Sequence, residues 1–393
     1  MNHRAKNIIC STKAVFAAFL MSFFTCWPVV ALPQASDSGL GISTGGSLLN
    51  MPPDALENRL EDIKQLGATW IRVDFTWVVI QPRNANEFQF YFHDKVVNAA
   101  NRAGLKIMGV LAYTPKWART PQCKALAGHN PSAQQKCAPR SNREFARFAS
   151  KTAERYRFPE VSAWELWNEP NLVGGWKDVN KQGELEINPI SFARFASRTA
   201  QAMRAVDPSV AIVTGGMAPM FEPSPSRGMR QSDFLRGMLP HLTRGEITAI
   251  GIHPYTYPAT PRDKKIWNAF FTVDGSDPGL NLRAILDGAG RSDLLLWATE
   301  FGASTIGTTP THPKPSDHIL PDHVDEKTQA RIVQEGIEDW YKKLGVGPLF
   351  VYTDSDYYLP RRDNEGGFGL RRHDGSPKPA YDALRNAFRE LKL

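Results

Sequence analysis

The chain has 393 residues, of which 42% are hydrophobic and 22% charged, a balance that excludes an intrinsically disordered protein. This length suits one large barrel or two ordinary domains. The formal charge is +7, and three bases without any acid fall within residues 1–31, which leaves +4 for the rest. So small an excess does not indicate a nucleic-acid partner, although it permits an acidic polysaccharide.

The first 31 residues have the pattern of a signal peptide. A basic start precedes an apolar run at residues 14–24, and small residues suit cleavage after Ala31 or, as the second choice, after Ala35. An uncleaved membrane anchor is the alternative. No later stretch is apolar enough to span a bilayer, so we expect an exported protein, periplasmic or secreted, without stable membrane insertion after cleavage.

Two of the four cysteines remain once the leader is removed. Cys123 and Cys137 lie close together in a stretch rich in Pro, Gln and Asn. In an oxidising compartment, such an even pair predicts one disulfide that closes a small loop. No metal site is expected, because two thiols with only His129 nearby provide too few ligands.

Short apolar runs alternate with amphipathic helical runs along the rest of the chain. Eight runs are predicted strands, at residues 40–43, 70–75, 106–111, 163–167, 211–214, 247–252, 294–299 and 349–352. Helices are predicted between them, for example at 55–66, 142–156, 190–206 and 327–344. Strict alternation favours a parallel sheet, and eight units fit a single (β/α)8 barrel, the TIM barrel of the α/β class, better than an open sheet. The missing Gly-x-Gly-x-x-Gly also counts against a dinucleotide-binding domain.

The segments that follow the predicted strands are long on one side only. They span residues 113–141, 171–189, 255–278, 303–325 and 353–379, whereas the segments before strands are short. Long loops on one face of a barrel mark the face that binds ligand. No linker divides the chain, so we predict one domain over residues 36–393.

Two helical segments repeat almost the same sequence. Residues 145–153 and 192–200 match nearly residue for residue, at an offset of about one βα unit. Both have apolar residues at three- and four-residue spacing. We interpret the match as convergence of two helices that face the barrel rather than as a functional repeat.

Two glutamates stand at the ends of apolar strands. Glu169 closes the run that ends Trp-Asn-Glu-Pro, and Glu300 lies far downstream in Trp-Ala-Thr-Glu-Phe-Gly. An isolated Glu-Pro is ordinarily a surface feature, but here Trp164 and Trp167 surround the carboxylate. Burial raises the pKa of a carboxyl group, which a general acid at neutral pH needs. A pair of carboxylates is what acid/base chemistry at a glycosidic bond requires.

These motifs resemble glycoside hydrolase clan A, the retaining (β/α)8 hydrolases, with families 39 and then 5 as the nearest. The resemblance covers nearly all of residues 36–393. It rests mainly on Trp-Asn-Glu-Pro-Asn at 167–171, which is highly specific, and on Ala-Thr-Glu-Phe-Gly at 298–302. Further matches are Ile-Arg-Val-Asp-Phe at 71–75, Tyr-Thr-Pro-Lys-Trp-Ala at 113–118 and His-Pro-Tyr at 253–255.

The resemblance implies a role for each matching residue. Glu169 would be the acid/base and Glu300 the nucleophile. Asn168 would hydrogen-bond the sugar 2-hydroxyl, a contact that strengthens in the transition state. The remaining residues would support Glu300: Arg72 by its charge, Tyr255 by its phenolic hydrogen, and His253 as part of the same floor. No cofactor is implied, the partner is a carbohydrate, and we expect a monomer.

Aromatic side chains on the loops are candidates for stacking on sugar rings. Clan members often have tryptophan at the end of the eighth strand, where this chain has Tyr352. Trp117, Trp176 and Trp267 lie on long loops, where each fits loop packing as well as stacking. The identity of the sugar at the cleavage point is therefore left open.

Long loops favour an extended cleft, so we expect an endo-acting hydrolase of a polysaccharide, for example a bacterial exopolysaccharide. The same loops are compatible with a closed pocket and an exo-acting β-xylosidase-like enzyme. A transglycosylase would share every catalytic residue. A non-catalytic carbohydrate-binding barrel is the alternative from another class, and it predicts the loss of a glutamate, whereas both are present.

Overall fold

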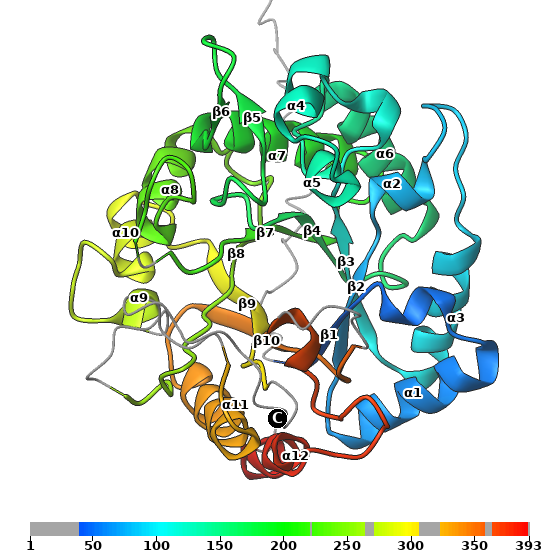
Figure 1. Ribbon diagram of the computed structural model, residues 1–393, viewed down its shortest axis with the longest axis vertical. Coiled ribbons are helices and arrows are strands. Elements are labelled where there is room, and N and C mark those ends of the chain that lie inside the picture. The colour runs from blue at the N-terminus through cyan, green and yellow to red at the C-terminus, as the bar shows by residue number, and fades with distance from the viewer. Residues whose placement is uncertain (1–38, 221, 264–270, 306–322, 358–363, 392–393) are drawn as a thin grey trace, which may run out of the picture. The chain divides into compact units, whose positions relative to one another are not determined.

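A closed barrel of parallel strands forms the centre of the molecule (Figure 1). The computed structural model describes residues 39–220, 222–263, 271–305, 323–357 and 364–391, within the compact unit Leu32–Leu393. The strand order around the barrel is β1-β10-β9-β8-β7-β4-β3-β2, where β1 pairs with both β10 and β2. The strands are β1 Leu40–Gly45, β2 Trp70–Asp74, β3 Lys106–Leu111, β4 Ala163–Asn168, β7 Ala211–Gly216, β8 Ala249–Ile252, β9 Leu295–Phe301 and β10 Val346–Tyr352.

The predicted (β/α)8 barrel is confirmed, and every predicted strand corresponds to one of these eight strands. The longer helices surround the barrel: α1 Pro53–Gln65, α3 Tyr91–Ala103, α6 Asn142–Arg155, α7 Pro189–Arg204, α8 Gln231–Met238, α10 Leu282–Gly288, α11 Glu326–Trp340 and α12 Pro379–Leu391. The predicted leader, residues 1–31, lies outside the described residues. Among the described helices, none combines the length and apolar character that crossing a membrane demands.

Shorter elements lie mainly in the loops that follow strands, so the prediction of long loops on one face agrees with the structure (Figure 1). They are α2 Trp77–Ile80, α4 Pro121–Leu126, α5 Pro131–Gln135, α9 Phe271–Asp274, the hairpin of β5 Asp178–Val179 and β6 Leu185–Glu186, and the 3-10 helices η1 Ser47–Asn50, η2 Lys116–Ala118, η3 Leu239–His241 and η4 Asn364–Gly367. The disulfide between Cys123 and Cys137 is confirmed and joins α4 to the segment after α5, with a Cα–Cα distance of 6.0 Å.

The two helices with nearly the same sequence pack against each other. Side-chain caps begin both: Ser141 accepts from the backbone N–H of Glu144 at the start of α6, and Asn188 accepts from that of Ser191 at the start of α7. Their apolar faces meet at a ring-centroid distance of 4.6 Å between Phe145 and Phe195. The repeated apolar pattern therefore also serves the packing of the two helices on each other, which the sequence pattern alone did not predict.

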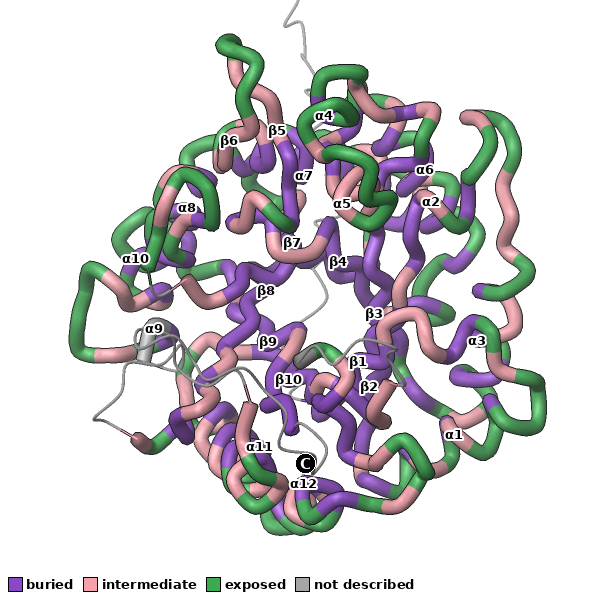
Figure 2. Tube along the Cα trace, in the orientation of Figure 1, coloured by how far each residue is buried: buried purple, intermediate pink, exposed green. Residues whose placement is uncertain are grey.

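The barrel interior is built in levels because alternate residues of each strand point inward. The lower level is an apolar cluster that includes Trp70, Met108, Trp297 and Phe350. Two residues further along, β2 carries Arg72 instead of Trp70, and β4 carries Glu165 two residues after Ala163. Figure 2 shows that the barrel strands are buried along most of their length. The polar level thus lies on an apolar floor, at the end where the strands stop.

Candidate active site

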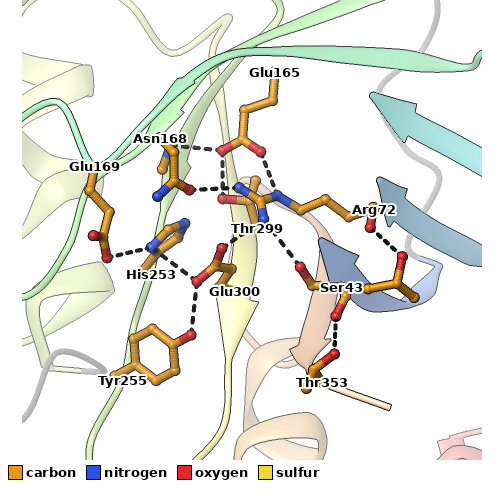
Figure 3. A network of polar contacts seen from close by, with 12 residues as sticks. Ser43, Arg72, Glu165, Asn168, Glu169, His253, Tyr255, Thr299, Glu300 and Thr353 are labelled. Atoms are coloured by element: carbon orange, nitrogen blue, oxygen red, sulfur yellow. Dashed lines mark hydrogen bonds and ion pairs between the residues drawn. The ribbon is translucent and has the colours of Figure 1, made fainter. Parts of the chain in front are cut away.

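The C-terminal ends of the parallel strands bring the predicted residues together (Figure 3). Arg72 comes from β2, Asn168 ends β4 with Glu169 directly after it, and Glu300 belongs to β9. Two further side chains follow β8, namely His253 and Tyr255. All six predicted polar residues join one network of hydrogen bonds and ion pairs, although they come from distant parts of the chain.

Arg72 is the centre of this network. Its Nε donates to Glu165 at 2.6 Å, its Nη1 to Glu300 at 2.6 Å, and its Nη2 to Oδ1 of Asn168 at 2.8 Å. Only 2% of the residue is exposed. Burial alone would lower the pKa of the guanidinium, but the charges of Glu165 and Glu300 outweigh it and raise the pKa above its usual value. Its Nη1 also donates to Ser43 Oγ at 3.1 Å, so Arg72 is a permanent cation whose planar group fixes four partners at once.

Glu300 is held as a carboxylate. Tyr255 donates its phenolic hydrogen to Oε2 at 2.9 Å, and Nδ1 of His253 lies 3.6 Å from the same oxygen. Burial by itself would raise the pKa of Glu300. The charges of His253 and Arg72, together with the hydrogen bonds from Tyr255 and Arg72, outweigh burial and lower that pKa. An ionised, supported carboxylate is suited to act as a nucleophile.

Glu169 occupies a different setting. Its side chain is 26% exposed, against 13% for that of Glu300, so the expected deep burial of Glu169 is not found. Its Oε1 lies 3.2 Å from Nδ1 of His253, whose ring bridges the two glutamates (Figure 3). Because the same nitrogen is near Oε2 of Glu300, the two carboxylates face each other across a single imidazole edge.

Unusual backbone angles shape the end of β4. Trp167 and Glu169 have φ values of 80° and 49°, in the left-handed region that residues other than glycine seldom adopt. The indole of Trp167 packs on Trp176 and the helix phenylalanines, while Asn168 reaches Arg72 inside the barrel. Gly175 lets the following loop approach, since a Cβ there would stand 1.9 Å from the carbonyl oxygen of Glu169. Such strain is typical of functional sites.

Two acidic residues of the site were missed by the sequence reasoning. Glu165 is fully buried and accepts from Arg72, from the backbone N–H of Gly216 at 2.8 Å and from Thr299 Oγ1 at 2.9 Å. Asp74 lies at the end of β2, where burial together with the nearby charges of Glu300 and Glu165 raises its pKa to about 6, against the opposing effect of Arg72. Each follows an inward-facing residue at a spacing of two, which predicts that its side chain points inward, but the spacing does not identify its partner on another strand.

The aromatic predictions fare unevenly. The prediction of stacking at Trp176 is wrong: the residue is 1% exposed and packed among Trp167, Phe192 and Phe195. Trp117 lies outside the network, with its Nε1 donating to the carbonyl of Gln81 at 2.8 Å and the guanidinium of Arg140 over its ring.

Tyr352 does lie at the site. Its ring is half-buried against Phe368, and burial together with neighbouring charges, among them that of Glu300, raises the pKa of its hydroxyl. Its contact with substrate stays a prediction, and Trp267 falls outside the described residues. Among the described side chains, no group of three or more His, Cys, Asp or Glu is placed to hold a metal ion.

A family comparison agrees with this geometry. Residues 37–327 match the model of the cellulase family, glycosyl hydrolase family 5. The chain belongs to glycosyl hydrolase family 5. This match contains both strand-end glutamates and confirms the predicted membership of clan A, in which family 39 had been placed ahead of family 5.

Other relatives of this family 5 chain come from neighbouring groups. A β-xylosidase of Geobacillus stearothermophilus is 29% identical over 246 residues, which are 59% of this chain and 42% of the relative, so the chain spans less than half of that protein. A family 39 glycoside hydrolase from Bacteroides cellulosilyticus WH2 has a TM-score of 0.60 at 20% identity, covering 91% of this chain and 64% of the other. A monomeric β-xylosidase from Caulobacter crescentus CB15 also has a TM-score of 0.60 at 20% identity, covering 90% and 70%. These structures share the fold.

Proposed function

We propose that this chain is an exported, retaining β-glycoside hydrolase that cleaves a polysaccharide by double displacement. The observation that carries the proposal is a pair of glutamates in unequal surroundings that lie 3.2 and 3.6 Å from one nitrogen of His253. Retaining enzymes have carboxyl groups about 5–5.5 Å apart, and inverting enzymes need roughly 6.5–9.5 Å to admit a water. Two oxygens at these distances from one nitrogen are at most 6.8 Å apart, which is compatible with the first geometry, and the family membership supports retention over inversion.

In the first step, Glu300 attacks the anomeric carbon and forms a glycosyl ester, while the bond to the leaving oxygen breaks. Glu169 donates its proton to that oxygen, so the aglycone departs as an alcohol. Arg72 binds Oδ1 of Asn168 at 2.8 Å, which directs the amide N–H groups away from the arginine. The amide is then available to the sugar 2-hydroxyl, the contact that strengthens as positive charge develops at the anomeric carbon.

In the second step, Glu169 acts as a base. Its carboxylate takes a proton from water, the water oxygen attacks the anomeric carbon from the face that the aglycone left, and Glu300 is released as a carboxylate. Two inversions give retention of configuration. The partial exposure of Glu169 supports this assignment, because the residue that activates water must be within reach of it.

An endo-acting hydrolase of a polysaccharide is our first choice of substrate class. It is supported by the described parts of the loops that follow β3, β4, β8 and β10, which lie at the end of the barrel that carries the glutamates. Export is supported by the leader pattern and by the disulfide, since disulfides persist in oxidising compartments.

An exo-acting β-xylosidase is the second candidate, favoured by the β-xylosidase of Geobacillus stearothermophilus that is 29% identical to this chain. A transglycosylase would use the same residues with a sugar acceptor in place of water.

A hydrolysis screen tests the proposal. The protein is incubated with xylan, glucan, mannan and acidic exopolysaccharides and, in parallel, with aryl β-xyloside. Product sizes are read by mass spectrometry and product anomers by NMR. A spread of oligosaccharides with the β configuration first supports endo action, and release of single xylose units supports the second candidate. Products larger than the substrate indicate transglycosylation. Absence of turnover on the whole panel, or first products of the α configuration, contradicts a retaining β-hydrolase.

A further inference from the structure

A hollow on the outer wall of the barrel is lined by arginines. It has a volume of about 540 Å³ and lies between the start of α6 and the second and third turns of α7. Six residues line it: Arg140, Ser141, Asn142, Arg143, Arg194 and Arg198. Four of the six carry a positive charge and none carries a carboxylate. Such a concentration of one sign contrasts with a chain whose mature part is only mildly basic.

Most of this charge is not neutralised within the described part of the protein. Arg140 pairs with Glu144, through Nη2 at 2.9 Å and Nε at 3.1 Å. The other three, Arg143, Arg194 and Arg198, are exposed and have no ion-pair partner among the described residues. Arg194 and Arg198 are four residues apart on one helix, a spacing at which like charges repel. A bound anion would remove that repulsion.

The sequence repeat provides an internal comparison. The counterparts of Arg194 and Arg198 on α6 are Arg147 and Lys151, and both are satisfied: Arg147 donates to the carbonyl of Ala85 at 2.7 Å, and Lys151 pairs with Glu154 at 2.6 Å. The two helices share their apolar pattern, and they differ in what their basic residues meet. Of these two pairs of basic residues, Arg194 and Arg198 on α7 line the hollow, and the pair on α6 does not.

The N-terminal end of α6 adds to the positive electrostatic potential of the hollow. Ser141 caps the backbone N–H of Glu144, while the N–H groups at the very start of a helix have no partner within it. The positive end of the helix dipole therefore lies beside the guanidinium groups. Guanidinium forks bind carboxylate, sulfate and phosphate through paired hydrogen bonds. Two independent features, the arginines and the helix start, thus favour the same kind of ligand.

We propose that this hollow binds an anionic substituent of an acidic polysaccharide, outside the catalytic centre. The position favours a substrate chain, because α6 and α7 flank β4, which leads into Glu169, and both begin at the face where the strands end. A chain held there would keep its other segments near the catalytic face. The choice of a polysaccharide as ligand rests on the proposed function, whereas the preference for an anion rests on the arginines alone.

Binding of defined polymers tests this proposal without turnover. The variant Arg143→Gln/Arg194→Gln/Arg198→Gln is compared with Arg157→Gln/Arg331→Gln/Arg389→Gln, which removes the same charge at exposed positions elsewhere. Affinity for polygalacturonate, dextran sulfate, neutral dextran and duplex DNA is measured at low and high salt. We expect the first variant to bind both acidic polysaccharides about tenfold more weakly at low salt, since each exposed charge contact is modest. The second variant should bind as the native protein does, and neutral dextran should be unaffected.

Three results would overturn the proposal: equal weakening in both variants, unchanged binding in the first, or tighter binding of DNA than of either polysaccharide. Hydrolysis of an aryl glycoside is measured beside them. The hollow variant should keep that activity, because the small substrate does not reach α7. If aryl glycosides are not hydrolysed at all, the proposed function fails, while the binding measurements still decide on the hollow.

Discussion

Two neighbouring levels of the barrel interior share the same strands and have opposite chemistry. In the lower level, Trp70 meets Trp297 and Phe350 edge to face, at ring-centroid distances of 5.8 and 6.1 Å. Two residues further along each strand, the side chain that faces the interior is polar: Arg72, Thr299 and Tyr352. Apolar burial in the lower level stabilises the fold, whereas the upper level holds charges that burial alone disfavours. A step of two residues thus separates the part that folds the barrel from the part that does chemistry.

The largest effect is expected in the upper level, at Glu300. Glu300→Ala should lower turnover roughly 10⁵-fold or more, because no glycosyl ester can form without the nucleophile. Turnover of an activated aryl glycoside, with the melting temperature measured alongside, checks it. Added azide should restore turnover and give a glycosyl azide of inverted configuration. If Glu300→Ala retains activity within tenfold of that of the native protein, Glu300 is not the nucleophile.

Glu169→Ala should show a smaller loss that depends on the leaving group. Turnover of substrates with poor leaving groups should fall about 10²–10⁴-fold, because their oxygen must be protonated as it departs. An activated aryl glycoside should lose much less in the glycosylation step. Azide should here give a product of retained configuration. If the two mutants exchange their azide products, the two roles are exchanged.

Trp297→Ala tests the lower level. Removing a large buried side chain should destabilise the protein by about 3–5 kcal/mol, measured by denaturant unfolding. At low temperature the folded variant should keep its pH profile and turnover, since Trp297 belongs to the apolar cluster rather than the polar network. A changed pH profile in a variant of unchanged stability would show that the two levels are not separate.

The smallest predicted effect concerns Tyr255. Its hydrogen bond is one of the contacts that lower the pKa of Glu300. Tyr255→Phe should therefore raise that pKa and move the acid limb of kcat/KM to higher pH, by about one unit or less. Stability should change little, in contrast to Trp297→Ala. An acid limb that stays in place or moves to lower pH would contradict the support that Tyr255 gives to Glu300.

The sequence predicted the barrel and the two glutamates because both depend on local pattern. Short apolar runs indicate the strands, and right-handed parallel connections place the C-terminal ends of all strands on one face of the barrel. Glu169 and Glu300 could therefore be predicted to lie near each other before any contact was known. Glu165 was missed for the opposite reason. A charge inside an apolar strand is interpretable only once its partner, Arg72, is known to lie across the barrel.

Trp176 failed because loop position does not determine exposure. The residue lies on a long loop as predicted, but the turned backbone at Trp167 brings a second indole beside it, and both pack on Phe195. Local pattern cannot report a contact between segments that meet only in the folded chain. By contrast, Cys123 and Cys137 were paired correctly, because only two cysteines lie outside the predicted leader.

The bond between Arg72 and Glu165 has a consequence for the full catalytic cycle. When the proposed glycosyl ester forms, Glu300 loses its negative charge, and a lone buried guanidinium beside it would become an uncompensated cation. Glu165 takes no part in the bond changes and keeps its contact of 2.6 Å with Nε. Arg72 therefore has a counter-ion in every state of the cycle. The proposed cycle therefore passes between the free and the glycosylated enzyme without leaving the buried guanidinium of Arg72 without a negative partner.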